Sequence, residues 1–186
     1  MKLKTITVFG SARPVPGSEA YRQARMLGQQ LAQAGFDVVN GGYGGTMQAV
    51  SQGATEAGGA AIGVTCALFE DRQRSGNAYL SQTVYTPDLL ARLRKLTDLG
   101  DGFVVLDGGV GTLLELFLVW NLLTLDVFDK PCVLVGDHWR RALQGLERET
   151  RLGIEHINML NIVDTVQQAV TLLNRIKTKE FEKWQT

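Results

Sequence analysis

Residues 101–115, DGFVVLDGGVGTLLE, combine residue types that bind a phosphate with one that could do chemistry beside it. The apolar run 103–106 predicts a buried strand, and the glycines after it predict a sharp turn that lets the backbone approach a ligand. These glycines are Gly108, Gly109 and Gly111. We expect Thr112 to open a helix, whose unpaired N–H groups and partial positive charge bind anions. Glu115 follows one turn later. The segment therefore predicts a nucleotide site with a carboxylate next to it.

Two further turns of the same kind follow apolar runs earlier in the chain. One is Gly-Ser-Ala-Arg at 10–13, and the other is Asn-Gly-Gly-Tyr-Gly-Gly at 40–45. In an open parallel sheet, ligands bind at the carboxyl ends of the strands, so we expect all three turns to line one site. Their candidate ligand-binding residues are Ser11, Gly41, Gly42 and Gly45. No turn carries GKS, GKT or the GxGxxG fingerprint, so the sequence indicates neither a Walker loop nor an NAD site.

Short β-rich runs alternate with longer helical ones along the whole chain. We expect strands at 5–9, 37–40, 60–65, 83–85, 103–106, 132–135 and 161–163. We expect helices at 18–34, 45–57, 87–99, 112–125, 138–149 and 164–182. Their end signals are Gly35 as a C-cap, Pro87 in a first turn and Asp164 as an N-cap. The polar segment 66–82 reads as a mobile surface loop. The alternation predicts a single α/β domain over residues 1–186, a doubly wound, Rossmann-like parallel sheet with helices on both faces.

The composition excludes several classes of function. Hydrophobic residues make up 45% of the chain, and 19 basic residues balance 19 acidic ones, which leaves no electrostatic footprint for nucleic acid. No run of about 18 apolar residues predicts a membrane span. The N-terminus enters a strand without a signal-peptide pattern, and Cys66 and Cys132 read as buried free thiols, so we expect a cytoplasmic protein. His138 and His156 stand alone, and no spacing suggests a metal site.

The turn residues resemble the Lonely Guy phosphoribohydrolase family, whose members were long labelled lysine decarboxylases. The family signature PGGxGTxxE is similar to DGGVGTLLE at 107–115, and its GGGxxGLM element is similar to NGGYGGTM at 40–47. The opening FxGS matches Phe9-Gly10-Ser11. The resemblance covers roughly residues 5–136. It implies hydrolysis of a nucleoside 5′-monophosphate, of the cytokinin riboside monophosphate or AMP type, to free base and ribose 5-phosphate, with no metal or other cofactor.

Two departures from the family pattern bear on the substrate. Asp107 replaces the family proline and adds a negative charge near the expected phosphate. The family's upstream ERK triplet falls on Ala91-Arg92-Leu93, while a competing register places its arginine at Arg94, followed by Lys95. At these positions the chain resembles relatives in the same superfamily that are thought to carry a molybdenum cofactor. A non-catalytic carrier of a nucleotide-like or molybdenum-pterin cofactor is therefore the alternative function, and a nucleotide binder of unknown partner is a third.

Cleavage of an N-glycosidic bond builds positive charge on the ribose, which a carboxylate stabilises while it orients or deprotonates water. Glu115 is the candidate for that role, and its alternative role is to complement the helix dipole. Arg92 would clamp phosphate or donate to the leaving base, or else lie solvated on its helix. Thr112 would bind phosphate or act as an N-cap. Ser11 and Arg13 would contact the base or ribose, or form a plain turn. Met47 reads as a core residue.

The decarboxylase label requires a lysine placed to form a Schiff base with pyridoxal phosphate. The lysines are Lys2, Lys4, Lys95, Lys130, Lys177, Lys179 and Lys183. Lys130 precedes a strand, on the opposite edge of the sheet from the turns, and the others lie near the termini or beside Arg94. The sequence therefore does not support a lysine decarboxylase.

The helix expected at 112–125 is apolar on more than one face. One sheet covers only about one stripe of a helix, so residues such as Phe117 and Leu118 need another cover. We expect a homodimer with this helix at its centre.

Overall fold

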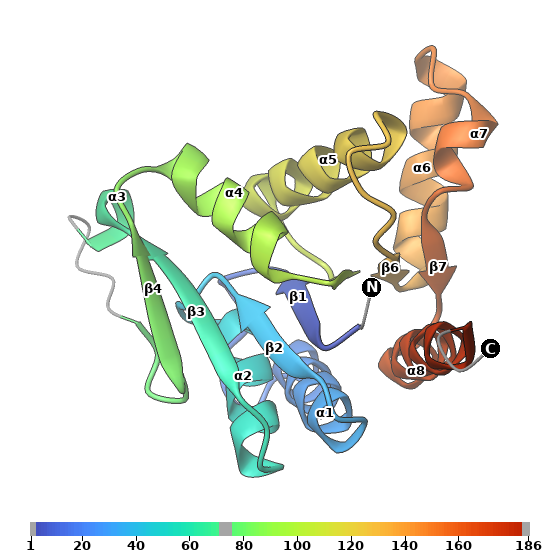
Figure 1. Cartoon of the computed structure of the whole chain (residues 1–186). Coiled ribbons are helices and arrows are strands. Elements are labelled where there is room, and N and C mark those ends of the chain that lie inside the picture. The colour runs from blue at the N-terminus through green and yellow to red at the C-terminus, as the bar shows by residue number, and fades with distance from the viewer. Residues whose placement is uncertain (1–2, 71–75, 184–186) are drawn as a thin grey trace.

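The computed structural model describes residues 3–70 and 76–183, and these form one seven-stranded parallel sheet with helices on both faces (Figure 1). The strand order is β4-β3-β2-β1-β5-β6-β7. The strands are β1 (Thr5–Phe9), β2 (Asp37–Asn40), β3 (Ala61–Cys66), β4 (Gln82–Thr86), β5 (Gly102–Val105), β6 (Cys132–Val135) and β7 (Asn161–Val163). From β1 the chain builds the sheet outward in one direction and then in the other. The predicted doubly wound α/β fold is confirmed.

The helices divide between the two faces because each crossover in a parallel sheet is right-handed. The helices are α1 (Glu19–Gln33), α2 (Thr46–Glu56), α3 (Ala67–Glu70), α4 (Leu89–Leu99), α5 (Val110–Thr124), α6 (Asp137–Glu149), α7 (Ile154–Ile157) and α8 (Val166–Lys183). One apolar layer joins the sheet to α1, α2 and α8, and another joins it to α4, α5 and α6 (Figure 1). Successive strand residues pack in different layers: in β1, Val8 lies in the first layer and Phe9 in the second.

Three helix starts differ from the sequence-based expectation. Helix α5 begins at Val110 with Gly109 as its N-cap, so Thr112 is the third helical residue and does not open the helix. The carboxylate of Asp88 accepts from the Ala91 N–H at 2.8 Å and caps α4, which leaves Pro87 outside that helix. Asp164 does not cap α8, because its carboxylate pairs with Arg140 at 2.5 Å.

Helix α8 is capped by the neighbouring hydroxyl, since Thr165 Oγ1 accepts from the Gln168 N–H at 3.3 Å. The expected C-cap of α1 is confirmed: Gly35, with a φ of 73°, follows the cap residue Ala34. A left-handed φ of this kind is open to glycine at no steric cost.

The segment 66–82 contains more structure than a surface loop. Ala67–Glu70 forms the short helix α3, and the Asn77 N–H donates to the Gly42 carbonyl at 2.8 Å. Residues 71–75 lie outside the described residues. The described part of the segment is thus fixed against the turn that follows β2.

Glycines let α1 and α2 approach until their backbones touch. A Cβ at Gly28 would lie 2.1 Å from the Val50 carbonyl oxygen, and one at Gly53 would lie 1.9 Å from that of Arg25. No side chain fits at either position unless the helices separate. Since α1 and α2 follow the turns after β1 and β2, this contact also fixes those turns relative to each other.

We therefore expect Gly28→Ala to lower the free energy of unfolding by about 1–3 kcal/mol, the usual effect of overpacking. Gly145→Ala is the matched control, because Gly145 lies inside α6 with nothing within 4 Å of an added Cβ. That change should raise stability by about 0.5–1 kcal/mol. Urea unfolding of both variants checks the prediction, and equal midpoints would contradict it.

Candidate functional site

The backbone of Ser11 joins the three turns at the carboxyl edge of the sheet. Its N–H donates to the Asp107 carbonyl at 3.0 Å, and its own carbonyl accepts from the Thr46 N–H at 2.9 Å. A Cβ at Gly45 would lie 2.5 Å from the Ser11 carbonyl oxygen, so only glycine allows this approach. The prediction that the turns meet at one edge is confirmed.

A cavity of about 1140 Å³ opens where the turns meet. Eight of the ten candidate residues line it, namely Ser11, Gly41, Arg92, Gly108, Gly109, Gly111, Thr112 and Glu115. Gly42 and Gly45 are not part of its lining. Gly42, with a φ of 81°, packs against β3, where an added Cβ would lie 3.0 Å from Thr65 Cγ2. These two glycines therefore shape the turn rather than face the cavity.

The turn after β5 presents the N-terminus of α5 to the cavity. No side chain caps this end of the helix, and the Leu113 N–H is the first to donate within it, to the Gly109 carbonyl at 3.0 Å. The N–H groups of Val110, Gly111 and Thr112 thus belong to the open first turn, which favours an anion. The Thr112 hydroxyl is buried against Gly108, where an added Cβ would lie 2.1 Å from its Oγ1.

Arg92 and Glu115 form a buried ion pair on the wall of the cavity. Arg92 Nη1 lies 3.3 Å from Glu115 Oε1, with side chains only 7% and 12% exposed. Arg92 Nε donates to the Val64 carbonyl at 2.9 Å, and Nη2 donates to the Gly41 carbonyl at 3.3 Å. One guanidinium therefore connects β3, the turn after β2 and helix α5.

The position of Arg92 bears on the two alignments that the sequence left open, which place the family's arginine at Arg92 or at Arg94. Arg94 and Lys95 line a separate depression beside β4, away from the turns. Arg92 is not a solvated residue on its helix, since it is buried and its guanidinium makes three hydrogen bonds. Of the two arginines, Arg92 is the one that lines the cavity.

Burial dominates the electrostatics of Glu115. The loss of solvent raises the pKa of its carboxyl to about 7, and the nearby Arg92 guanidinium opposes that rise. A carboxyl with a pKa near neutrality exchanges its proton readily, which suits a general base or acid.

Sequence reasoning missed two aromatic residues of the site. The guanidinium carbon of Arg92 lies 5.9 Å from the centre of the Tyr43 ring and 5.4 Å from that of Phe69. The Tyr43 hydroxyl accepts from the Cys66 N–H at 2.9 Å, which fixes the ring. Tyr43 was visible as the aromatic inside the glycine turn, whereas nothing in the sequence singles out Phe69.

Other expected residues fall in different places. Met47 is a half-buried part of the cavity wall and not a core residue, with Sδ 2.6 Å from where a Cβ at Gly41 would lie. Ser11 Oγ accepts from the Arg13 N–H at 3.1 Å, and both residues line the cavity.

No lysine lines the cavity in the described part of the chain, and Lys130 Nζ donates to the Thr97 carbonyl at 2.9 Å. The described residues also contain no group of three or more His, Cys, Asp or Glu side chains that could hold a metal ion. Within residues 3–70 and 76–183, no helix is both long and apolar enough to cross a membrane.

The fold and the cavity define a doubly wound α/β protein with an open helix N-terminus and a buried Arg–Glu pair in one site. A protein-family model described as "Possible lysine decarboxylase" matches residues 47–173. The chain belongs to this family, which confirms the resemblance in its motifs.

Relatives in this family carry a specific enzyme name. The cytokinin riboside 5′-monophosphate phosphoribohydrolase of Rhodococcoides fascians is 32% identical over 147 residues, which cover 77% of this chain and 74% of the relative. The protein of the same name from Mycobacterium tuberculosis is 32% identical over 173 residues, covering 89% and 91%.

Solved structures with the same fold carry a different description. The molybdenum cofactor binding protein of Rippkaea orientalis superposes with a TM-score of 0.73 at 24% identity, covering 95% of this chain and 98% of that one. The molybdenum cofactor carrier protein of Chlamydomonas reinhardtii gives 0.67 at 20% identity, covering 92% and 96%. At these identities the likeness concerns the fold.

The raised pKa of Glu115 predicts a specific pH dependence of stability. Between about pH 4.5, its ordinary pKa, and about pH 7 the folded protein binds more protons than the unfolded chain, so stability falls as pH rises through this window. Glu115→Gln cannot titrate there. The difference in unfolding free energy between the two proteins should therefore change by about 3 kcal/mol across the window. Denaturant unfolding from pH 4.5 to pH 8 measures it, and parallel profiles would refute the assignment.

Proposed function

We propose that the protein hydrolyses the N-glycosidic bond of a nucleoside 5′-monophosphate to a free base and ribose 5-phosphate. The observation that carries this proposal is the Glu115 carboxyl, buried beside Arg92 one turn beyond an open helix N-terminus. The names of the relatives in Rhodococcoides fascians and Mycobacterium tuberculosis support the same reaction. AMP and cytokinin riboside monophosphates are the substrate types to test.

Each part of the site has its own role in the proposed reaction. The N–H groups of Val110, Gly111 and Thr112 hold the 5′-phosphate at the start of α5. The ribose then lies beside Glu115, whose carboxylate stabilises the positive charge that develops on the sugar and takes a proton from the attacking water. The water oxygen bonds to C1′ as the C1′–N bond breaks. The departing base nitrogen takes up a proton from solvent, and Glu115 then releases to solvent the proton it took from the water.

Arg92 has two roles in this scheme. Its positive charge favours the ionised form of Glu115, which burial alone would protonate. Its guanidinium is fixed by two backbone carbonyls and two rings at the cavity wall. There it donates a hydrogen bond to the leaving base.

A non-catalytic carrier of a nucleotide-like cofactor is the second candidate. The fold it shares with molybdenum cofactor carrier proteins favours it, and so does the exposed Asp107 where the enzyme signature has proline. The two functions differ in one measurable property, the release of base.

Glu115→Gln separates enzyme from carrier. It keeps the side-chain shape but removes the charge, so we expect turnover to fall on the order of 100-fold or more with little change in ligand affinity. Base release from a panel of nucleoside monophosphates, followed by chromatography, is the measurement. Asp98→Asn, an exposed carboxylate outside the cavity, is the control and should keep full activity. No release from the unmodified protein would favour the carrier.

We further propose that the protein is a cytoplasmic homodimer built on α5. The cytoplasmic location rests on two buried free thiols, Cys66 and Cys132. The dimer rests on the apolar residues that α5 leaves at the surface, since an exposed patch of this kind usually marks an interface. These are Val110, Leu113, Leu114 and Phe117, of which Val110 is 84% exposed.

Phe117→Glu should dissociate the dimer at micromolar concentration, because it buries a charge in an apolar interface. Light scattering coupled to gel filtration would show the change in mass. Ile154→Glu places the same charge on an exposed apolar residue of α7 and should leave the mass unchanged. A monomeric unmodified protein would rule out the dimer.

A further inference from the structure

The cavity extends well beyond the groups that the proposed reaction uses. Arg92 bonds to backbone at the ends of β2 and β3, on one side of the turn after β5. Val135, Gly136 and His138, which follow β6, line the same cavity, and so does Asp164, which follows β7. The strand order places these two groups on opposite sides of β5.

Strand spacing gives the length of this cavity. Neighbouring strands lie about 4.8 Å apart, so β2 and β7, four steps apart, are separated by about 19 Å. The turn after β5 lies midway, with two steps, about 10 Å, on either side. In the proposed reaction a nucleoside monophosphate extends from this turn toward Arg92, which leaves the β6–β7 side of the cavity to another group.

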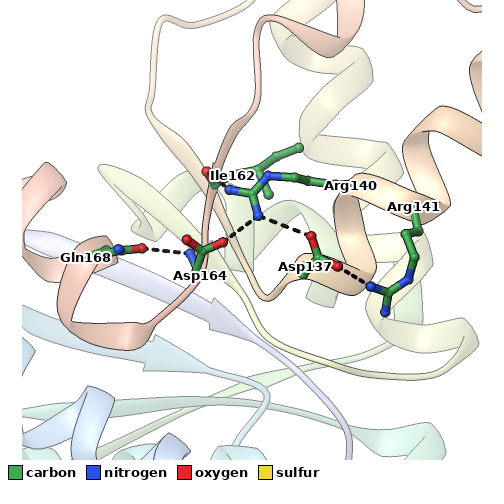
Figure 2. Close-up of polar contacts among 6 residues, drawn as sticks. All are labelled: Asp137, Arg140, Arg141, Ile162, Asp164 and Gln168. Atoms are coloured by element: carbon green, nitrogen blue, oxygen red, sulfur yellow. Dashed lines mark hydrogen bonds and ion pairs between the residues drawn. The ribbon is translucent and has the colours of Figure 1, made fainter.

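The β6–β7 side of the cavity presents a carboxylate as a hydrogen-bond acceptor. Asp164, which follows β7, supplies it. Arg140 Nη1 holds Asp164 at 2.5 Å and also contacts Asp137 at 3.5 Å, as Figure 2 shows. The Asp164 N–H donates to Gln168 Oε1 at 2.8 Å. Asp164 is therefore a fixed acceptor on the cavity wall.

His138 adds a polar atom that the described residues leave without a hydrogen bond. Its Nε2 is buried and has no partner within residues 3–70 and 76–183. The imidazole folds back over Gly136, where an added Cβ would lie 2.6 Å from Nδ1. An unsatisfied buried nitrogen lowers stability unless a ligand group or water completes it.

These groups select the chemistry of what binds there. A carboxylate accepts hydrogen bonds from hydroxyl and amino groups. We propose that the β6–β7 side of the cavity binds a hydroxylated group, such as a sugar or a nucleoside, that is linked through phosphate to a nucleotide held at the turn after β5. This inference rests on the proposed function only in placing the phosphate at the turn after β5.

Calorimetry with AMP, ADP and ADP-ribose tests the inference, using Glu115→Gln protein so that no ligand is consumed. ADP-ribose carries a ribose on its second phosphate, whereas ADP ends at that phosphate. We expect ADP-ribose to bind about tenfold or more tightly than AMP, the effect of one or two net hydrogen bonds. ADP should bind no more tightly than AMP.

Two variants test which residues make the additional contacts with ADP-ribose. Asp164→Asn and His138→Ala should each reduce the advantage of ADP-ribose severalfold and leave AMP affinity unchanged, whereas Asp98→Asn should change neither. Equal binding of AMP and ADP-ribose, or an advantage that survives both variants, would overturn the inference while leaving the proposed function intact. ADP-ribose binding that depends on Asp164, without any AMP binding, would instead overturn the proposed function alone. Binding of none of the three ligands would overturn both.

Discussion

The site depends on one buried guanidinium. Arg92 bonds to the Val64 and Gly41 carbonyls and to the Glu115 carboxylate, and its guanidinium carbon lies near the centres of two aromatic rings. A buried charge is tolerated only when such partners replace its hydration. Because those partners come from β3, the turn after β2 and helix α5, the charge of Arg92 couples the two halves of the fold at the point where chemistry is expected.

The direction change at β1 makes this coupling possible. The first half of the chain builds the sheet from β1 to β4, and α4 then carries it back to β5 on the other side of β1. Adjacent turns at this reversal leave a crevice at the carboxyl edge, which is where ligands bind in such sheets. The backbone of Ser11 spans the crevice, and glycines at neighbouring positions remove the side chains that would hold the turns apart.

Charge divides the cavity into regions with different chemistry. The first turn of α5 offers N–H groups to an anion, Arg92 lies on one side of it, and the carboxylate of Asp164 lies on the other. The chain belongs to a family with relatives named as phosphoribohydrolases, and it shares its fold with a molybdenum cofactor binding protein. A fold shared by proteins of different function does not choose between them, and the side chains around the cavity decide which function a chain performs.

The sequence by itself determined the strands, the long helices, the sheet type and the glycine turn after β5, because apolar runs and glycine spacing are local signals. It also placed Glu115 beside that turn. Only the tertiary structure separated Arg92 from Arg94 on the same helix, since Arg92 is buried in the cavity wall and Arg94 is exposed in a separate depression. Only the tertiary structure likewise shows that Phe69, His138 and Asp164 line the cavity, because the strand order brings them to it. Helix starts such as Val110 likewise depend on cap geometry rather than residue type.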